Sequence, residues 1–216
     1  EGHSFPTRRS SDLAALRTSL AELKVPVDFR LVDPARWGAS EQDPTLLMIA
    51  AARGWPEGIE QLLAAGADPA ARMALDRSTV MFAIRHHDPD AGTGLVRAVS
   101  QLLDAGVEAA AADARGLTAL HDVARVRDDA VATSLADLLL RRGADANAVA
   151  ECCGTPLTVA AERRNQALIE RLLAVPELRV DIPGRAGMTP LGFAAAGGQC
   201  ALVRELIERD RKSTRL

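Results

Sequence analysis

Apolar residues recur along most of the chain at helical spacing, in short blocks separated by polar turns. From residue 41 onward the blocks come in pairs: an alanine-rich first helix, then a second helix that closes on two adjacent aliphatic residues. These aliphatic pairs are Leu62-Leu63, Leu102-Leu103, Leu139-Leu140, Leu172-Leu173 and Leu206-Ile207. A threonine precedes each first helix, with separations of 34, 39, 37 and 34 residues: Thr45, Thr79, Thr118, Thr155 and Thr189. The pattern predicts five helix–turn–helix repeats, at residues 41-74, 75-113, 114-149, 150-183 and 184-209.

One such helix pair cannot bury its own apolar face, so we expect neighbouring pairs to stack into a continuous core. The distance from the threonine to the aliphatic pair is 17 residues in the first, fourth and fifth repeats, but 23 and 21 in the second and third. We expect the extra residues between the two helices of these repeats, at His87 to Gly94 and at Arg125 to Ala130.

The third repeat carries the most specific motif. It reads Gly-Leu-Thr-Ala-Leu-His-Asp-Val-Ala from Gly116 and ends in Leu-Leu-Leu-Arg-Arg-Gly-Ala-Asp-Ala-Asn-Ala at Ala148. This stretch resembles one ankyrin repeat almost from end to end, and the resemblance extends, with more departures, from Glu41 to Arg209. It implies an all-α ankyrin-repeat solenoid, in which helix–turn–helix repeats stack and short β-hairpin-like loops join them.

The recurring motif residues have expected structural roles. A threonine at a helix start caps free backbone N–H groups with its hydroxyl. Pro156 and Pro190 suit the first helical turn, where no N–H is needed. Glycines follow the second helices of the first three repeats, where a left-handed conformation ends a helix: Gly66, Gly106 and Gly143.

The resemblance implies that His121, in the Thr-x-Leu-His motif, bridges neighbouring loops by hydrogen bonding. The other repeats replace this histidine with Met48, Phe82, Thr158 and Gly192. We therefore expect the polar link between loops to be thin along the stack.

Both ends of the chain are expected to be foreign to the natural protein. Ser4 to Leu13 resembles the translation of a short-read sequencing adapter, and Asp210 to Leu216 resembles the opposite adapter in the correct orientation. We interpret residues 1-13 and 210-216 as adapter-like artefactual tails, and the segment between them as a fragment of a longer protein. Residues 14-40 combine a helical leucine spacing with a loop, and are predicted to be a degenerate leading repeat remnant.

Composition narrows the classes of function. The chain is 48% hydrophobic but only 3% aromatic, which fits close-packed helices better than a sheet sandwich. A formal net charge of -3 provides no global positive field, so we expect no nucleic-acid partner. No apolar run approaches the ~18 residues of a membrane helix, so no membrane segment is expected in this chain. Arginine outnumbers lysine 24 to 2, a bias that we interpret as bacterial and GC-rich.

No catalytic signature occurs in the sequence, which holds no Ser/His/Asp order, no phosphate-binding glycine loop and no zinc motif. We expect no enzyme activity, no cofactor and no metal site. The stretch from His86 to Asp90 contains metal-ligand residue types, but we interpret it as a solvated loop; a cation site shared with Asp128 and Asp129 is the less favoured alternative. Cys152 and Cys153 are interpreted as small, partly buried residues and not as a redox pair.

Four arginines each fall at the end of a first helix: Arg53, Arg85, Arg125 and Arg163. In ankyrin arrays this position lines the concave face, so the four would form a basic stripe for an acidic partner. Arginine near a helix carboxyl end also gains ~0.3–1 kcal/mol from the helix dipole without any partner, and this simpler interpretation stays open. The remaining candidate partner contacts are His86 and four residues of the hairpin tips: Arg115, Leu117, Arg185 and Met188.

The resemblance implies a protein–protein interaction module, an adaptor, regulator or scaffold that binds another protein through its concave surface. Two alternatives stay open. One is the recognition module of a larger enzyme or secreted effector whose catalytic domain lies outside this chain, and the other is an immunity-type inhibitor of a toxin. The compartment is unknown, with the cytoplasm as the default, because loss of the natural amino terminus would remove any targeting signal.

Overall fold

The computed structural model describes residues 44–213, within which ten α-helices form five successive pairs. The first helices of the pairs are α3 (Leu46–Ala52), α5 (Thr79–Arg85), α7 (Ala119–Val123), α9 (Pro156–Arg163) and α11 (Pro190–Ala196). The second helices are α4 (Pro56–Ala64), α6 (Thr93–Asp104), α8 (Asp129–Arg141), α10 (Gln166–Leu173) and α12 (Cys200–Ser213). Three short 3-10 helices lie in connecting segments: η1 (Ala74–Asp76), η2 (Pro89–Ala91) and η3 (Arg185–Gly187). The expected remnant at 14-40 and the expected tail at 1-13 lie outside the described residues, and α12 continues past Arg209 into the other expected tail.

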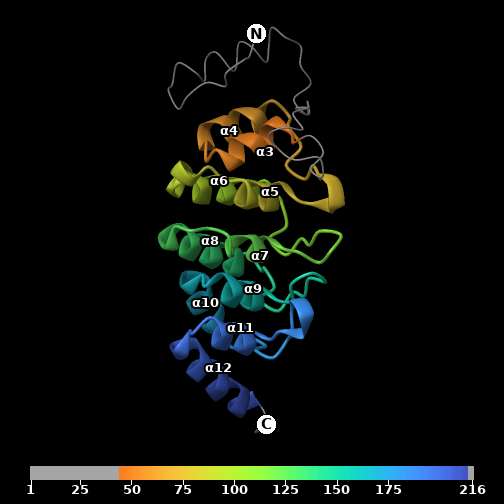
Figure 1. Cartoon of the computed structure of the whole chain (residues 1–216). Coiled ribbons are helices and arrows are strands. Elements are labelled where there is room, and N and C mark those ends of the chain that lie inside the picture. Colours follow the sequence, from red (N-terminus) through yellow and green to blue (C-terminus); the bar gives the residue numbers. More distant parts are fainter. Residues whose placement is uncertain (1–43, 214–216) are drawn as a thin grey trace, which may run out of the picture.

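The helices form two layers in which the pairs follow one another in chain order (Figure 1). Each first helix contacts the next one, from α3 through α5, α7 and α9 to α11, and α4, α6, α8 and α10 do the same in the second layer. The loops between repeats gather on one side of the stack, at the right in Figure 1. Two of them are closed by single antiparallel bridges, Ala112 to Thr118 and Ala150 to Gly154. The predicted all-α solenoid of stacked helix–turn–helix repeats, joined by hairpin-like loops, is confirmed.

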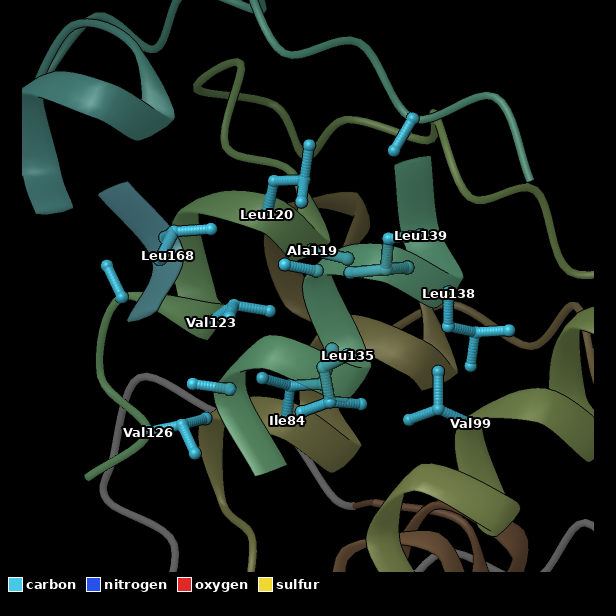
Figure 2. Close-up of a cluster of buried hydrophobic side chains, with 14 of the residues drawn as sticks. Ile84, Val99, Ala119, Leu120, Val123, Val126, Leu135, Leu138, Leu139 and Leu168 are labelled. Atoms are coloured by element: carbon cyan, nitrogen blue, oxygen red, sulfur yellow. The ribbon is translucent and has the colours of Figure 1, made fainter. Parts of the chain in front are cut away.

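The core is continuous across the repeats. Ile84 of α5, Leu120 of α7, Leu135 and Leu139 of α8, and Leu168 of α10 are all completely buried. Figure 2 shows these side chains gathered between helices that belong to three successive repeats. Burying one such side chain stabilises the fold by about 1.5–3 kcal/mol, and here that burial depends on a neighbouring repeat.

The first helix of the second repeat is capped one residue earlier than expected. Ser78 caps α5, because its hydroxyl oxygen accepts the backbone N–H of Met81 at 3.3 Å. Thr79 is the first helical residue, and its hydroxyl donates to the carbonyl oxygen of Pro69 at 2.9 Å. Serine caps a helix as well as threonine does, so the threonine spacing misplaced this boundary. The predicted threonine is the N-cap residue of the other four first helices: Thr45 on α3, Thr118 on α7, Thr155 on α9 and Thr189 on α11.

The extra residues of the second and third repeats only partly lie between helices. The second helices α6 and α8 are 12 and 13 residues long, against 9 in α4 and 8 in α10. Thr93 and Gly94 belong to the first turn of α6, and Asp129 and Ala130 to that of α8. The expected location was therefore wrong in part, because a helix accommodates added residues by extending one turn as readily as a loop does.

Glycine ends the second helices of the first three repeats. Gly66, Gly106 and Gly143 have positive φ angles of 94°, 98° and 86°, the left-handed conformation that only glycine adopts without strain. Pro156 and Pro190 are the first residues of α9 and α11, where proline costs no hydrogen bond.

His121 links the third repeat to the fourth. Its Nδ1 accepts the backbone N–H of Thr118 at 3.1 Å, so the proton lies on Nε2, which donates to the carbonyl oxygen of Gly154 at 3.0 Å. Burial lowers the pKa of His121 below 6.5, against a smaller opposing effect of the bond to Gly154. The imidazole is therefore held neutral in this bridge.

The polar link is not confined to the third repeat. Thr158, at the corresponding position of the fourth repeat, donates its hydroxyl to the carbonyl oxygen of Ile182 at 3.2 Å. A hydroxyl can replace an imidazole here because Thr158 Oγ1 also lies 3.0 Å from Thr155 Oγ1. Met48 and Phe82 instead pack in a separate buried cluster with Ala52 and Met73. The polar link is therefore thin, as expected, with a threonine hydroxyl that adds one polar contact within the fourth repeat.

Candidate protein-binding surface

The first helices and the loops between repeats form one face of the stack, which we call the first-helix face (Figure 1). The four arginines expected to form a stripe there differ in their surroundings. Arg53 caps the carboxyl end of α3, is 44% exposed, and lies 3.9 Å from the Asp88 carboxylate. Arg163 is the last residue of α9 and is exposed.

The other two arginines converge on one buried carboxylate, Asp122 of α7. Its Oδ1 lies 3.5 Å from Nη1 of Arg85 and 3.7 Å from Nε of Arg125. The Asp122 side chain is only 2% exposed, whereas those of Arg85 and Arg125 are 22% and 42% exposed. The two central arginines of the predicted stripe, Arg85 and Arg125, are therefore positioned by the buried Asp122. No pattern in the sequence had marked this aspartate.

Asp122 is ionised at neutral pH at a cost. Burial raises the pKa of its carboxyl from 3.8 to about 6, and the opposing effects of Arg85 and Arg125 are smaller. Its second oxygen, Oδ2, is buried and has no hydrogen-bond partner among the described residues. An unsatisfied buried carboxylate oxygen is costly, and two long ion pairs compensate only part of that cost.

We expect acidification to stabilise the fold through Asp122. Its folded pKa of about 6 exceeds the ordinary 3.8, so this contribution is fully present below pH 3.8 and is lost as the pH rises through 6. Between pH 7 and pH 5, the unfolding free energy of the natural sequence should rise by about 1 kcal/mol relative to that of Asp122→Asn. Urea unfolding of both proteins at the two pH values measures this difference. If acidification does not raise the unfolding free energy of the natural sequence relative to that of Asp122→Asn, the raised pKa of Asp122 is contradicted.

A second carboxylate, Asp113, shapes the hairpin tip of the third repeat. Its Oδ1 accepts the backbone N–H groups of Arg115 at 2.8 Å and Leu117 at 2.9 Å, while its Oδ2 lies 3.5 Å from Nε of the buried Arg77. This arrangement leaves the Arg115 side chain exposed. Leu117 is half-buried and packs against the core, so much of its surface is already covered within the fold.

The hairpin tip of the fifth repeat likewise combines an exposed arginine with a half-buried apolar residue. Arg185, in η3, is exposed. Met188 is half-buried and faces Gly192, where its Cε lies 3.3 Å from the position that a Cβ would take. Among the predicted tip residues, Arg115 and Arg185 thus offer the accessible side chains.

The segment from His86 to Asp90 is occupied by local interactions. The His86 ring lies 4.6 Å from the Phe82 ring, His87 Nδ1 is 2.8 Å from the carbonyl oxygen of Ile84, and Asp88 caps η2 by accepting the N–H of Asp90 at 3.0 Å. Across residues 44–213, no group of three or more His, Cys, Asp or Glu side chains is placed to hold a metal ion.

The two adjacent cysteines lie close together, with Cys152 exposed and Cys153 half-buried. Their sulfur atoms are 3.2 Å apart. Burial, followed by the hydrogen bond between the two cysteines, raises the pKa of the Cys153 thiol to about 12. A thiol with so high a pKa is a poor nucleophile at neutral pH.

A polar groove of about 560 Å³ lies where the turn after α7 meets the turn after α9. We call it the basic groove, and its charged lining consists of Arg125, Arg127, Asp129, Glu162, Arg163 and Arg164. Asn165, which caps α10, clamps the two walls together: its Nδ2 donates to the carbonyl oxygens of Val123 at 3.2 Å and Val126 at 3.0 Å. Sequence spacing identified Arg125 and Arg163 but missed Arg127 and Arg164, because only the stacking of repeats brings these two turns together.

Comparison with known proteins identifies the class. The family described as "Ankyrin repeats (3 copies)" matches residues 129–215, so the chain carries ankyrin repeats from α8 through α12. Alpha-latrotoxin-Lg1a from Latrodectus geometricus is 33% identical over 88 residues, which cover 40% of this chain and 6% of that protein. Alpha-latrotoxin-Lh1a from Latrodectus hasselti is 32% identical over 88 residues, with the same two shares. The chain thus matches only about 6% of the length of these curated relatives.

Helices α3 to α7 precede the matched residues, and the structure shows that they continue the same stack. Within the part of the chain that the structure describes, no helix is both long and apolar enough to span a membrane.

Proposed function

We propose that the chain is a protein-binding module of the adaptor or regulator type, and that the first-helix face is its contact surface. Ankyrin repeats generally mediate protein–protein interaction and are generally non-catalytic, which supports this assignment at the level of class. The observation that carries the proposal is the exposure of an arginine in each of three successive repeats, at two hairpin tips and at the end of one first helix: Arg115, Arg163 and Arg185. Arginine is enriched among the residues that contribute most to binding energy at protein interfaces.

Site-specific photo-cross-linking tests the location of the surface. A photoreactive amino acid is introduced at Arg115 or Arg185 on the first-helix face, and at the exposed Glu170 or Arg141 on the second helices as matched controls. We expect a discrete cross-linked protein from a lysate of the source organism at the first two positions only. Equal capture from both faces, or capture from the second helices alone, would contradict the proposal.

One observation favours the alternative in which the array is part of a larger protein. The region similar to the alpha-latrotoxins is a small fraction of each of those proteins. We expect the complete gene to decide between a free-standing adaptor and a recognition segment: an additional domain in the same reading frame supports the second, and its absence supports the first. The bacterial origin interpreted from arginine usage stays a prediction.

A further inference from the structure

We propose that the basic groove between the third and fourth repeats binds a short acidic segment, rich in aspartate and glutamate, of the partner protein. This inference rests on the proposed function and adds the location and the chemistry of the contact. The groove differs from the predicted stripe, because it combines two arginines of the stripe, Arg125 and Arg163, with two that come from the turns, Arg127 and Arg164.

The arginines of the groove are accessible, and three of them are uncompensated. Arg125, Arg127, Arg163 and Arg164 are all exposed. No ion pair or hydrogen bond between described side chains involves Arg127, Arg163 or Arg164, whereas Arg125 lies 3.7 Å from the buried Asp122. Guanidinium groups in this state can form paired hydrogen bonds to an incoming carboxylate without first breaking internal ion pairs.

The walls of the groove are rigid enough to hold a defined spacing between these charges. Asn165 fixes the start of α10 to the turn after α7 through two carbonyl oxygens, and it is itself buried. Arg164 also lines the groove and has a left-handed backbone with φ of 57°, but its Nε lies 3.3 Å from the position of a Cβ on Gly197, so its side chain extends toward the fifth repeat. A preorganised arrangement loses less conformational entropy when a ligand binds.

The charge balance selects a carboxylate-bearing peptide. Four arginines against Asp129 and Glu162 give the lining a local charge of about +2 when each ionised side chain counts as one unit. A charge of about +2 is balanced by two or three carboxylates, whereas a densely charged polyanion such as a nucleic acid would exceed it and would also meet the net charge of -3 of the whole chain. A peptide with two or three carboxylates matches this lining, and the volume of about 560 Å³ falls in the range of small-ligand pockets.

Fluorescence anisotropy with the full chain tests the inference. The probe is a fluorescein-labelled hexapeptide of glutamate and aspartate, and the reference is the same peptide with glutamine and asparagine. We expect the acidic peptide to bind more tightly, with an affinity that falls as the salt concentration rises. The double variant Arg127→Gln/Arg163→Gln should bind it about tenfold more weakly.

The matched control is Arg141→Gln/Arg204→Gln, which removes the same charge from exposed positions outside the groove. It should retain the affinity of the natural sequence. Equal loss in both double variants, or no loss in either, would overturn the inference. A phosphoserine peptide of equal charge that bound at least tenfold more tightly would also overturn it, in favour of a phosphorylated partner.

Failure here is distinguishable from failure of the proposed function. If the groove variant still cross-links a partner normally from the first-helix face, the acidic-segment inference fails and the proposed function stands. If no position on that face captures a protein while the acidic peptide still binds in an arginine-dependent way, the proposed function fails and the binding of acidic peptides by the groove stands.

Discussion

Leu139→Ala is expected to lower the unfolding free energy of the chain by about 3 kcal/mol. Leu139 lies in α8, is completely buried, and belongs to the core that joins the second, third and fourth repeats (Figure 2). Removing three carbon atoms leaves a cavity that packed helices on both sides cannot fill. Urea unfolding followed by circular dichroism measures the change.

Leu75→Ala is the matched control, since Leu75 is 38% exposed and its contribution to the stack is the carbonyl oxygen that accepts the N–H of Ala114. The backbone bond survives the substitution, so the expected loss is below about 1 kcal/mol. Equal losses from the two substitutions would show that the stack does not depend on a shared core. Because each repeat contacts only its neighbours, separate unfolding of the two halves of the Leu139→Ala stack would also agree with a shared core at this position.

His121→Ala is expected to cost about 3 kcal/mol at neutral pH, because two buried polar groups would lose their partner. These are the backbone N–H of Thr118 and the carbonyl oxygen of Gly154 in the next repeat. His87→Ala, at a half-buried histidine whose Nδ1 lies near the carbonyl oxygen of Ile84 three residues earlier, should cost less than about 1 kcal/mol.

The pH dependence of the His121→Ala effect provides a second check. Because burial lowers the pKa of His121 in the folded state, the unfolded chain binds a proton more readily, and the contribution of His121 falls as the pH drops below 6.5. The cost of the substitution should therefore be smaller at pH 5 than at pH 7.5. Acidification should thus reduce the contribution of His121 to stability and increase that of the adjacent Asp122. A general effect of acid on the fold would not produce both changes. A cost that grows on acidification would contradict a neutral, bridging imidazole.

Much of the fold was predictable, because stacking repeats reuse the same local chemistry. Paired aliphatics, the capping Thr45 and Thr155, and the glycine after each of the first three second helices act within a few residues, and their spacing is visible in the sequence. The sequence pattern did not identify Ser78 as the cap of α5, because serine and threonine cap helices equally well and the following Thr79 fitted the expected period.

The candidate surface was less predictable, because it depends on contacts between repeats. Asp122 binds Arg85 across 37 positions of sequence, and Asn165 reaches Val126 across 39. No local pattern marks a carboxylate or an amide for such a role. The order of the repeats could have indicated that the turns after α7 and α9 lie side by side. Both turns are rich in arginine, and this signal could have identified the groove, whereas the spacing of the first helices could not.

Hydrogen exchange of the full chain, with and without the partner that was identified by cross-linking, tests whether the first-helix face and the basic groove form the binding surface. We expect slower amide exchange in the bound state at the hairpin tip around Arg115 and at the turn from Arg163 to Asn165, with the second helices α8 and α10 unchanged beyond their first turns. Protection confined to the second-helix layer would contradict the claim that the first-helix face and the basic groove form the binding surface.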